Sequence, residues 1–187
     1  GHFLLHSMIG STDHHVAESL FSTFFIMFFM LALISAKKKK LRFEDVFNKN
    51  LKVLKEPFIY SVLAGVMYSA YQLCWPGGSL FLLIVLVYAI FQCIFDNFRN
   101  ESSDYLGFTG VVTCLVSTIL ILPFVHPDMG FSLYYYSWFH VITSLGAMAS
   151  FAALSLIERE FKRKKIKAYY YPLLILGAGI LGLIFIK

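Results

Sequence analysis

The stretch "VAESLFSTFFIMFFMLALISA", residues 16–36, decides the fold of this chain. It is long enough to cross the hydrocarbon core of a bilayer, which takes about 20 residues as a helix. Its one charged residue is Glu18, near its start, and four lysines at 37–40 follow it directly. A helix is the predicted structure, because backbone groups in lipid must find their hydrogen-bond partners within the segment. The stretch therefore predicts a transmembrane helix with a basic end.

The rest of the chain repeats this pattern. Of its 187 residues, 58% are hydrophobic and 14% are charged, whereas a soluble domain carries about 25% charged residues. We predict an all-α fold, a polytopic bundle of about six transmembrane helices that forms a single membrane domain over residues 1–187. Beyond 16–36, the predicted spans are 57–75, 79–95, 105–125, 134–157 and 168–186, which contain no Asp, Glu, Lys or Arg.

The basic residues predict the orientation of these helices. All of the 16 lysines and arginines except Lys187 lie in the connections after the first, third and fifth spans. The positive-inside rule places these connections in the cytoplasm, so residues 1–15 and both chain ends lie on the extracytoplasmic side of the cell membrane. Because the net charge of +5 is confined to one membrane face, it does not indicate nucleic-acid binding. Glu44 and Asp45 in the first connection predict a short surface helix.

Other residues favour structural roles. Cys74, Cys93 and Cys114 have no metal-binding spacing and are predicted to pack among apolar side chains. Trp138 and His140 are predicted to lie in the aromatic belt at the membrane interface. The polar side chains within the spans are predicted to form hydrogen bonds between helices; they are Gln72, Gln92, Thr113, Ser117 and Ser144.

A polar cluster, "STDHHVAES" at residues 11–19, stands at the start of the first span. One interpretation is structural: Asp13 caps the helix, Glu18 favours its positive end, and His14 and His15 are solvated. The other is a metal site. Residues two apart do not face each other on a helix, so Asp13 and His15 can share an ion only on the loop just before it. A carboxylate with a neutral imidazole suits Mn²⁺, Fe²⁺ or Zn²⁺, and is less usual for Mg²⁺.

Two ligands are too few for a tight site, so others must contribute. Glu18 is either an anion at the helix start or a hydrogen-bond partner of an imidazole N–H three or four residues away. Ligation by Glu18 together with His14 or His15 is a further alternative, but the chain has no HExxH pattern. In "FVHPDMG", His126 lies either in a proline-kinked turn or against a phosphate or lipid-linked sugar. Other candidates on the predicted outer side are His2, His6, His126 and Asp128.

The segment "GHFLLHSMIGSTDHHVAESLFSTF", residues 1–24, resembles the second catalytic loop of archaeal AglB-type oligosaccharyltransferases, the catalytic membrane subunit of N-glycosylation. That family binds a divalent cation between an acidic motif in its first outer loop and a motif in its second, commonly Asp-His-His. The resemblance implies that Asp13 and His15 are the metal ligands and catalytic residues, and that His14 points away. Gly10 matches the glycine three residues before the motif. His6 stands where many members have arginine.

The resemblance also implies a fold and partners. It implies the membrane domain of a GT-C type glycosyltransferase with Mn²⁺ or Mg²⁺ as cofactor. The donor is then an oligosaccharide on dolichol phosphate or diphosphate, and the acceptor is Asn of an Asn-x-Ser/Thr sequon in a polypeptide. Membrane lipid is a further partner and nucleic acid is not. His6 and His126 are the candidate substrate-binding residues. We expect a central fragment, without the family's TIxE and WWDYG motifs, that is inactive alone.

Two other functions remain open from the sequence. A transporter or channel fragment would use the outer histidines to bind or gate an ion, but it should show broken helices or charges at mid-membrane depth. Gly65 is the only helix-breaking residue in the interior of the predicted span 57–75, and no charged residue lies at mid-membrane depth in the predicted spans. A non-catalytic membrane scaffold predicts instead that Asp13 and His15 can be replaced without loss of function.

Overall fold

The computed structural model describes residues 15–126, 128, 130–164, 166, 170 and 171. All regular structure in this part of the chain is helical, which confirms the predicted all-α class. Of the predicted sixth span, only Tyr170 and Tyr171 are described, and both are helical. The elements are α2 (His15–Lys38), α3 (Phe43–Phe47), α4 (Leu51–Cys74), η1 (Pro76–Gly78), α5 (Ser79–Phe98), α6 (Asp104–Ile121), η2 (Leu122–Phe124) and α7 (Trp138–Arg163).

Four stretches of the described chain are long and apolar enough to cross a membrane: α2, α7, Pro76–Phe98 and Asp104–Phe124. Helix α4, which contains the predicted span 57–75, is as long as α2 but is not one of these four stretches. Its first turns carry Lys52, Lys55 and Glu56. This count agrees roughly with the predicted six spans. The predicted surface helix in the first connection is α3, in which the Asp45 carboxylate accepts a hydrogen bond from the backbone N–H of Arg42 (3.0 Å).

Two helices have other boundaries than the predicted spans that they overlap. Helix α4 begins at Leu51, six residues before the predicted span, because a helix can continue beyond the lipid into water. Helix α7 begins at Trp138 and not at Tyr134. Ser137 has extended backbone there, and its Oγ accepts a hydrogen bond from the N–H of Phe139 (3.3 Å). A serine that caps in this way ends the preceding segment and starts the helix. Helix α7 then runs on to Arg163, beyond the predicted end at residue 157.

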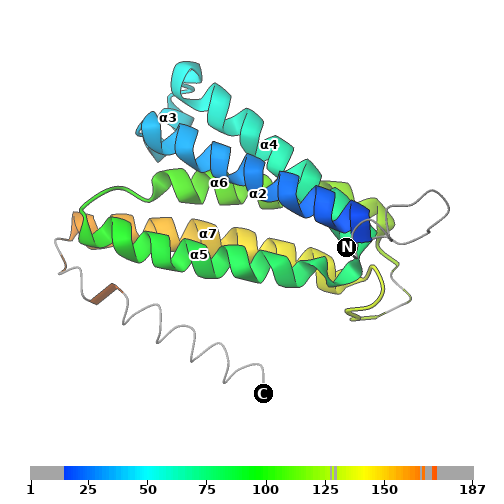
Figure 1. Cartoon of the computed structure of the whole chain (residues 1–187). Helices are drawn as coiled ribbons and strands as arrows, with labels where there is room; N and C mark the ends of the chain where they lie inside the picture. The colour runs from blue at the N-terminus through cyan, green and yellow to red at the C-terminus, as the bar shows by residue number, and fades with distance from the viewer. Residues whose placement is uncertain (1–14, 127, 129, 165, 167–169, 172–187) are drawn as a thin grey trace, which may run out of the picture.

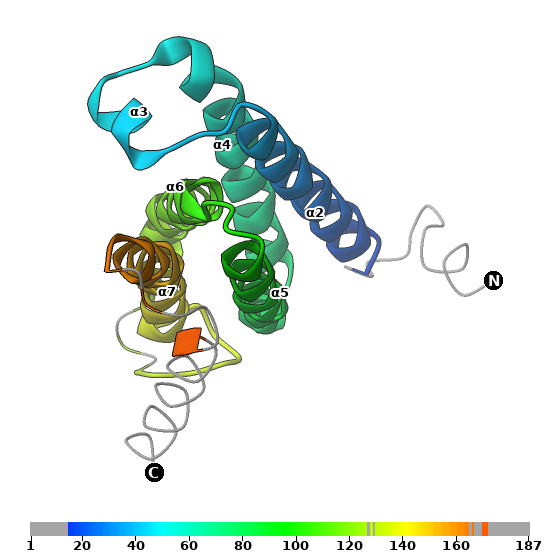
Figure 2. The same cartoon turned by 90° about the vertical axis from the view of Figure 1, so that its left-hand side faces the viewer.

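The long helices lie side by side (Figure 1). Helix α2 packs on α4, α6 contacts α2, α4 and α7, and α7 contacts α5. Figure 2 views the bundle from one end and shows α6 between α4 and α7. Small residues allow the close approaches. A methyl group at Gly65 would lie 2.7 Å from the carbonyl oxygen of Thr113, and one at Gly110 would lie 2.1 Å from the Phe151 ring. This is the packing expected of membrane helices, which associate through close backbone contact.

Aromatic side chains fill the space between the helices. Phe25 of α2 lies 5.0 Å from Tyr68 of α4, centroid to centroid, and Phe29 lies 6.2 Å from Phe151 of α7. All four side chains are buried. Cys93 and Cys114 are also buried, Cys74 is half-buried, and the three are free thiols, which confirms their predicted packing role.

The predicted interhelical hydrogen bonds are present only in part. Thr113 donates to the backbone oxygen of Ser61 in α4 (3.2 Å), and Gln72 donates to Ser79 Oγ in α5 (3.2 Å). Gln92 donates to Asp96 in its own helix (3.0 Å), and its side chain also forms a hydrogen bond with Tyr105 of α6. The hydroxyls of Ser117 and Ser144 have no partner in the structure.

The bundle has two chemically distinct ends (Figure 1). One, here called the basic end, contains the C-termini of α2, α5 and α7, helix α3, and the N-termini of α4 and α6. The other, here called the histidine end, contains the N-termini of α2, α5 and α7, together with η1, η2 and the segment 130–137. The candidate site lies at the histidine end.

Candidate functional site

His15 and Glu18 form a pair in the first turn of α2. Glu18 Oε2 lies 3.1 Å from His15 Nδ1, and the two residues are three apart on the helix, which is the spacing that brings side chains together. An ionised carboxylate only accepts hydrogen bonds, so Nδ1 carries the hydrogen. In the neutral imidazole the nitrogen that carries the lone pair is then Nε2. This contact matches the predicted partnership between Glu18 and an imidazole N–H.

The exposures of the two side chains differ. The His15 side chain is 60% exposed and that of Glu18 is 17% exposed. Glu18 therefore lies against the protein while the imidazole projects outward. The contact with Glu18 therefore orients the ring. His15 is the first residue of the described helix, one residue earlier than the predicted span begins. The backbone of Asp13, which decides whether the two side chains can share an ion, lies outside the described residues.

The remaining predicted ligands are tested only in part. Asp13 and His14 lie outside the described residues, as do His2 and His6, so the predicted Asp13–His15 metal pair stays a prediction. Among the described residues, no three His, Cys, Asp or Glu side chains are close enough to hold a metal ion.

His126, the other candidate substrate-binding residue, lies at the same end of the bundle. Its side chain is exposed, and its backbone N–H donates to the oxygen of Tyr136 (2.8 Å). This bond joins the segment after α6 to the segment before α7. The imidazole therefore projects from a turn that is tied down by its backbone, and its contact with a substrate stays a prediction.

His140 is a residue whose place the sequence prediction missed. The sequence predicts it in the aromatic belt at the membrane interface together with Trp138, but the exposed fraction of His140 is 0%, whereas that of Trp138 is 45%. His140 Nδ1 accepts a hydrogen bond from the N–H of Ser137 (3.4 Å), so Nε2 is the donor to the backbone oxygen of Pro76 (2.8 Å). The imidazole thus joins η1 to the start of α7. The only sequence signal was its position three residues after Ser137, typical of a capping box.

Two further hydrogen bonds hold the segment 130–137 in place. The Tyr136 hydroxyl donates to the backbone oxygen of Leu73 at the end of α4 (2.6 Å). The Ser137 hydroxyl donates to the oxygen of Ser132 (2.8 Å). Together with the bond from His140, the Tyr136–Leu73 bond fixes the α4–α5 and α6–α7 loops against each other.

A hollow of about 530 Å³ lies beside these loops. Its lining is mostly apolar and includes Trp75, Pro76, Leu80, Leu133 and Tyr134. Such a lining suits hydrocarbon better than a charged group. The histidine end therefore offers an oriented imidazole on α2 and, separately, an apolar hollow between the α4–α5 and α6–α7 loops.

Comparison with known proteins gives this end its context. Residues 1–185 match the family described as "Oligosaccharyl transferase STT3, N-terminal". The chain is 29% identical over 185 residues to the dolichyl-monophosphooligosaccharide–protein glycotransferase AglB of Haloferax volcanii, an alignment that covers 98% of this chain and 17% of that protein.

Solved structures of the Archaeoglobus fulgidus oligosaccharyltransferase are similar to it as well. The form tethered to an acceptor peptide with the NVT sequon has 30% identity and a TM-score of 0.81, and covers 100% of this chain and 22% of that one. The complex with Zn and sulfate has 30% identity and a TM-score of 0.74, and covers 100% of this chain and 23% of that one. This chain therefore spans about a fifth of the length of these relatives. The match to the family model extends over nearly the whole chain, and this chain belongs to the STT3 family of oligosaccharyl transferases.

Proposed function

We propose that the full-length protein containing this chain transfers a glycan from a dolichol-linked phosphate or diphosphate donor to the asparagine of an Asn-x-Ser/Thr sequon. The name of the Haloferax volcanii relative specifies a dolichyl monophosphate-linked oligosaccharide donor, and the Archaeoglobus fulgidus relative was solved with a sequon-containing acceptor peptide. The apolar hollow at the histidine end is consistent with a lipid-linked donor, because its lining suits a hydrocarbon chain.

We further propose that Asp13 and His15 contribute to a divalent-metal site, with Mn²⁺ or Mg²⁺ as the resident ion. The Archaeoglobus fulgidus relative was solved with Zn. The single observation that carries this proposal is the His15–Glu18 contact of 3.1 Å, because it leaves Nε2 of the neutral ring as the ligand nitrogen. A bound divalent ion would supply positive charge to stabilise the departing phosphate.

The residues of this chain then have separate tasks. Asp13 supplies an anionic oxygen, and His15 supplies a neutral nitrogen. Glu18 accepts the hydrogen of Nδ1 and keeps the ring in one orientation, as the partners of metal-bound histidines commonly do. His6 and His126 are assigned to the substrate, for which a neutral or charged imidazole is a suitable hydrogen-bond donor to phosphate or sugar.

We infer that the histidine end faces the extracytoplasmic side and that residues 1–187 form one membrane domain. The connections after the first and third spans begin beside Lys37 and Arg99. They lie at the same end of the bundle as the C-terminus of α7 at Arg163. Cytoplasmic connections are enriched in lysine and arginine. This common position of the basic connections supports the proposed orientation.

The experiment is glycan transfer to a sequon peptide by the full-length protein in membranes. Asp13→Ala and His15→Ala should each abolish transfer, and raised Mn²⁺ should restore part of it, while His14→Ala should retain near-normal transfer. Equal activity in the three variants would contradict the metal role and favour the scaffold function. Loss of transfer in His14→Ala alone would contradict the assignment of ligands within the motif.

A further inference from the structure

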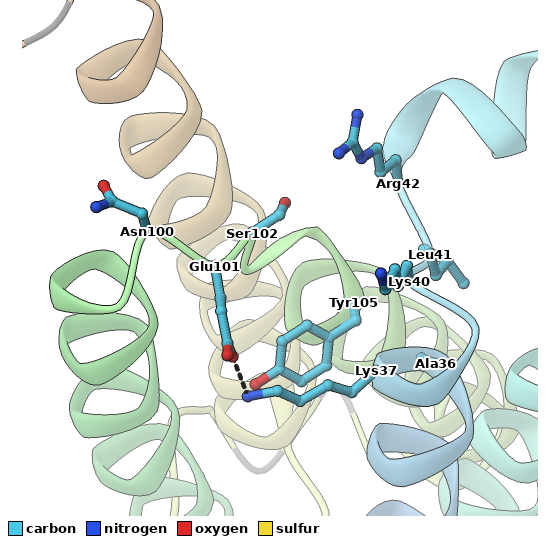
Figure 3. A pocket seen from close by; sticks show the side chains of 9 residues that line it. All are labelled: Ala36, Lys37, Lys40, Leu41, Arg42, Asn100, Glu101, Ser102 and Tyr105. Atoms are coloured by element: carbon cyan, nitrogen blue, oxygen red, sulfur yellow. Dashed lines mark ion pairs between the residues drawn. The ribbon is translucent and has the colours of Figure 1, made fainter.

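A second site lies at the basic end, away from the histidine cluster. A cavity of about 410 Å³ opens between the end of α2, the α2–α3 link and the α5–α6 connection. Figure 3 shows the side chains that surround it, among them Lys37, Lys40 and Arg42 on one side and Asn100 and Glu101 on the other. Two connections that are far apart in the sequence thus enclose one polar space.

Of the three basic side chains around the cavity, only Lys37 forms ion pairs with described residues. Lys37 Nζ lies 2.9 Å from Asp96 Oδ1 and 2.8 Å from Glu101 Oε2, so both carboxylates are already paired to this amine. Lys40 and Arg42 form no ion pair with any residue that the structure describes. Within the described part of the chain, the cavity therefore has two positive charges, those of Lys40 and Arg42, that no carboxylate pairs, next to Lys37, which two carboxylates already pair.

The backbone on both sides of the cavity has the same construction. Lys40, two residues after the end of α2, has its backbone in the left-handed region (φ 52°), and so has Asn100, two residues after the end of α5 (φ 56°). In each case the next residue donates a backbone hydrogen bond to the residue five positions earlier. The N–H of Leu41 donates to the carbonyl oxygen of Ala36, and the N–H of Glu101 donates to the carbonyl oxygen of Asp96. Glycine is the usual residue at this position of a helix end. Here the left-handed position of α2 carries a lysine that lines the cavity.

The surroundings indicate which anion would occupy the cavity. The helices that lead to it expose large apolar side chains, including Ile34 of α2 and Phe95 and Phe98 of α5. In a membrane such side chains face lipid tails, and the ends of the helices lie at the depth of the headgroups. Arginine and lysine are the side chains that proteins use to bind phosphate.

We propose that this cavity binds the phosphate group of an anionic phospholipid, held by Lys40 and Arg42. Basic pockets between transmembrane helices on the cytoplasmic side are known to bind anionic headgroups. The positive-inside rule alone accounts for basic residues in the connections, but not for a cavity that two connections enclose. This inference does not depend on the proposed transfer reaction, because it concerns the opposite end of the bundle.

The chain offers a matched control for the test. Lys49 is also at the basic end, also left-handed (φ 50°) and also exposed, but it does not line the cavity. Lys40→Gly and Lys49→Gly therefore remove the same charge from the same backbone conformation. Because glycine adopts this conformation readily, both variants should fold. Arg42→Gln removes the second charge without changing the backbone.

The measurement is native mass spectrometry of the full-length protein in detergent, titrated with phosphatidylglycerol, phosphatidylcholine or soluble glycerol phosphate. We expect Lys40→Gly combined with Arg42→Gln to weaken phosphatidylglycerol binding about twenty-fivefold, since each basic side chain beside the headgroup phosphate contributes about fivefold. Lys49→Gly should bind phosphatidylglycerol within about twofold of the unmodified protein. The affinity for phosphatidylcholine should differ by less than about twofold between the variants and the unmodified protein.

Three results would overturn the proposal. Equal loss in Lys49→Gly and in the double variant would assign the affinity to the general charge of this end. Phosphatidylcholine that binds as tightly as phosphatidylglycerol would remove the role of net charge. Soluble glycerol phosphate that competes at the same concentration as the lipid would assign the cavity to a free phosphate compound.

Discussion

Removal of the Glu18 carboxylate tests whether the structure explains how His15 is oriented. Glu18→Ala deletes the acceptor that lies 3.1 Å from His15 Nδ1. Without it the imidazole is expected to rotate and to exchange the hydrogen between its two nitrogens. The fraction of His15 that presents Nε2 to a metal falls, and the metal affinity of the full-length protein falls with it.

Two independent estimates give the size of this effect. Loss of a residue that orients a metal-bound histidine typically costs 10–100-fold in metal affinity, which is about 1.4–2.8 kcal/mol at 1.4 kcal/mol per tenfold. A hydrogen bond to a charged group contributes about 1.5–3 kcal/mol. Since the His15 side chain is 60% exposed, water competes for the ring, and we expect the lower end, about tenfold.

The assay is the Mn²⁺ concentration at which the full-length protein reaches half of its maximal glycan transfer to a sequon peptide. Glu18→Ala should raise that concentration about tenfold and recover most of the rate at saturating metal. Glu18→Gln should raise it less, because the amide oxygen still accepts the Nδ1 hydrogen. Ser19→Ala is the control, since it removes a bond to the His15 backbone oxygen (2.9 Å) and leaves the ring contact intact.

Two outcomes would refute the reasoning about Glu18. An unchanged half-maximal Mn²⁺ concentration in Glu18→Ala would show that the contact does not orient a metal ligand. Equal effects of Glu18→Ala and Glu18→Gln would show that the charge of Glu18 matters and the hydrogen bond does not.

Two further predictions concern stability, and both are measured by thermal unfolding of the full-length protein in detergent. Gly110→Ala should destabilise it by about 1–3 kcal/mol, because the new methyl group would lie 2.1 Å from the buried Phe151 ring; Gly146→Ala, with no atom within 4 Å, should stabilise α7 by about 0.5–1 kcal/mol. Equal shifts in the two variants would contradict the close approach of α6 and α7. The hydrogen bond from Lys37 lowers the pKa of Glu101 below its usual 4.5, so its contribution to stability is present above that pH and is lost as the pH falls through the lower folded value. The unmodified protein should therefore exceed Glu101→Gln in melting temperature at pH 7 and match it once the pH is below the lowered pKa of the folded state; a difference that persists at such low pH would contradict this assignment.

Local features of the sequence determined the class of this protein. The length and apolarity of residues 16–36, with lysines at 37–40, predicted a membrane helix that ends in water, and α2 ends at Lys38. The Asp-His-His motif at the start of that helix indicated the family, which the comparison confirms. The contact of Glu18 with an imidazole was also within reach, since it depends on a spacing of three residues on one helix.

Only the tertiary structure decided which side chains face inward. On a soluble helix an apolar stripe marks the buried face, but a membrane helix is apolar on all sides, so burial cannot be read from its pattern. His140 therefore looked like an interface residue and is instead buried against Pro76. Likewise, Lys37 and Asp96 are 59 residues apart and form an ion pair beside the basic cavity. Such contacts depend on how α2, α5 and α6 pack, because no local spacing relates these residues.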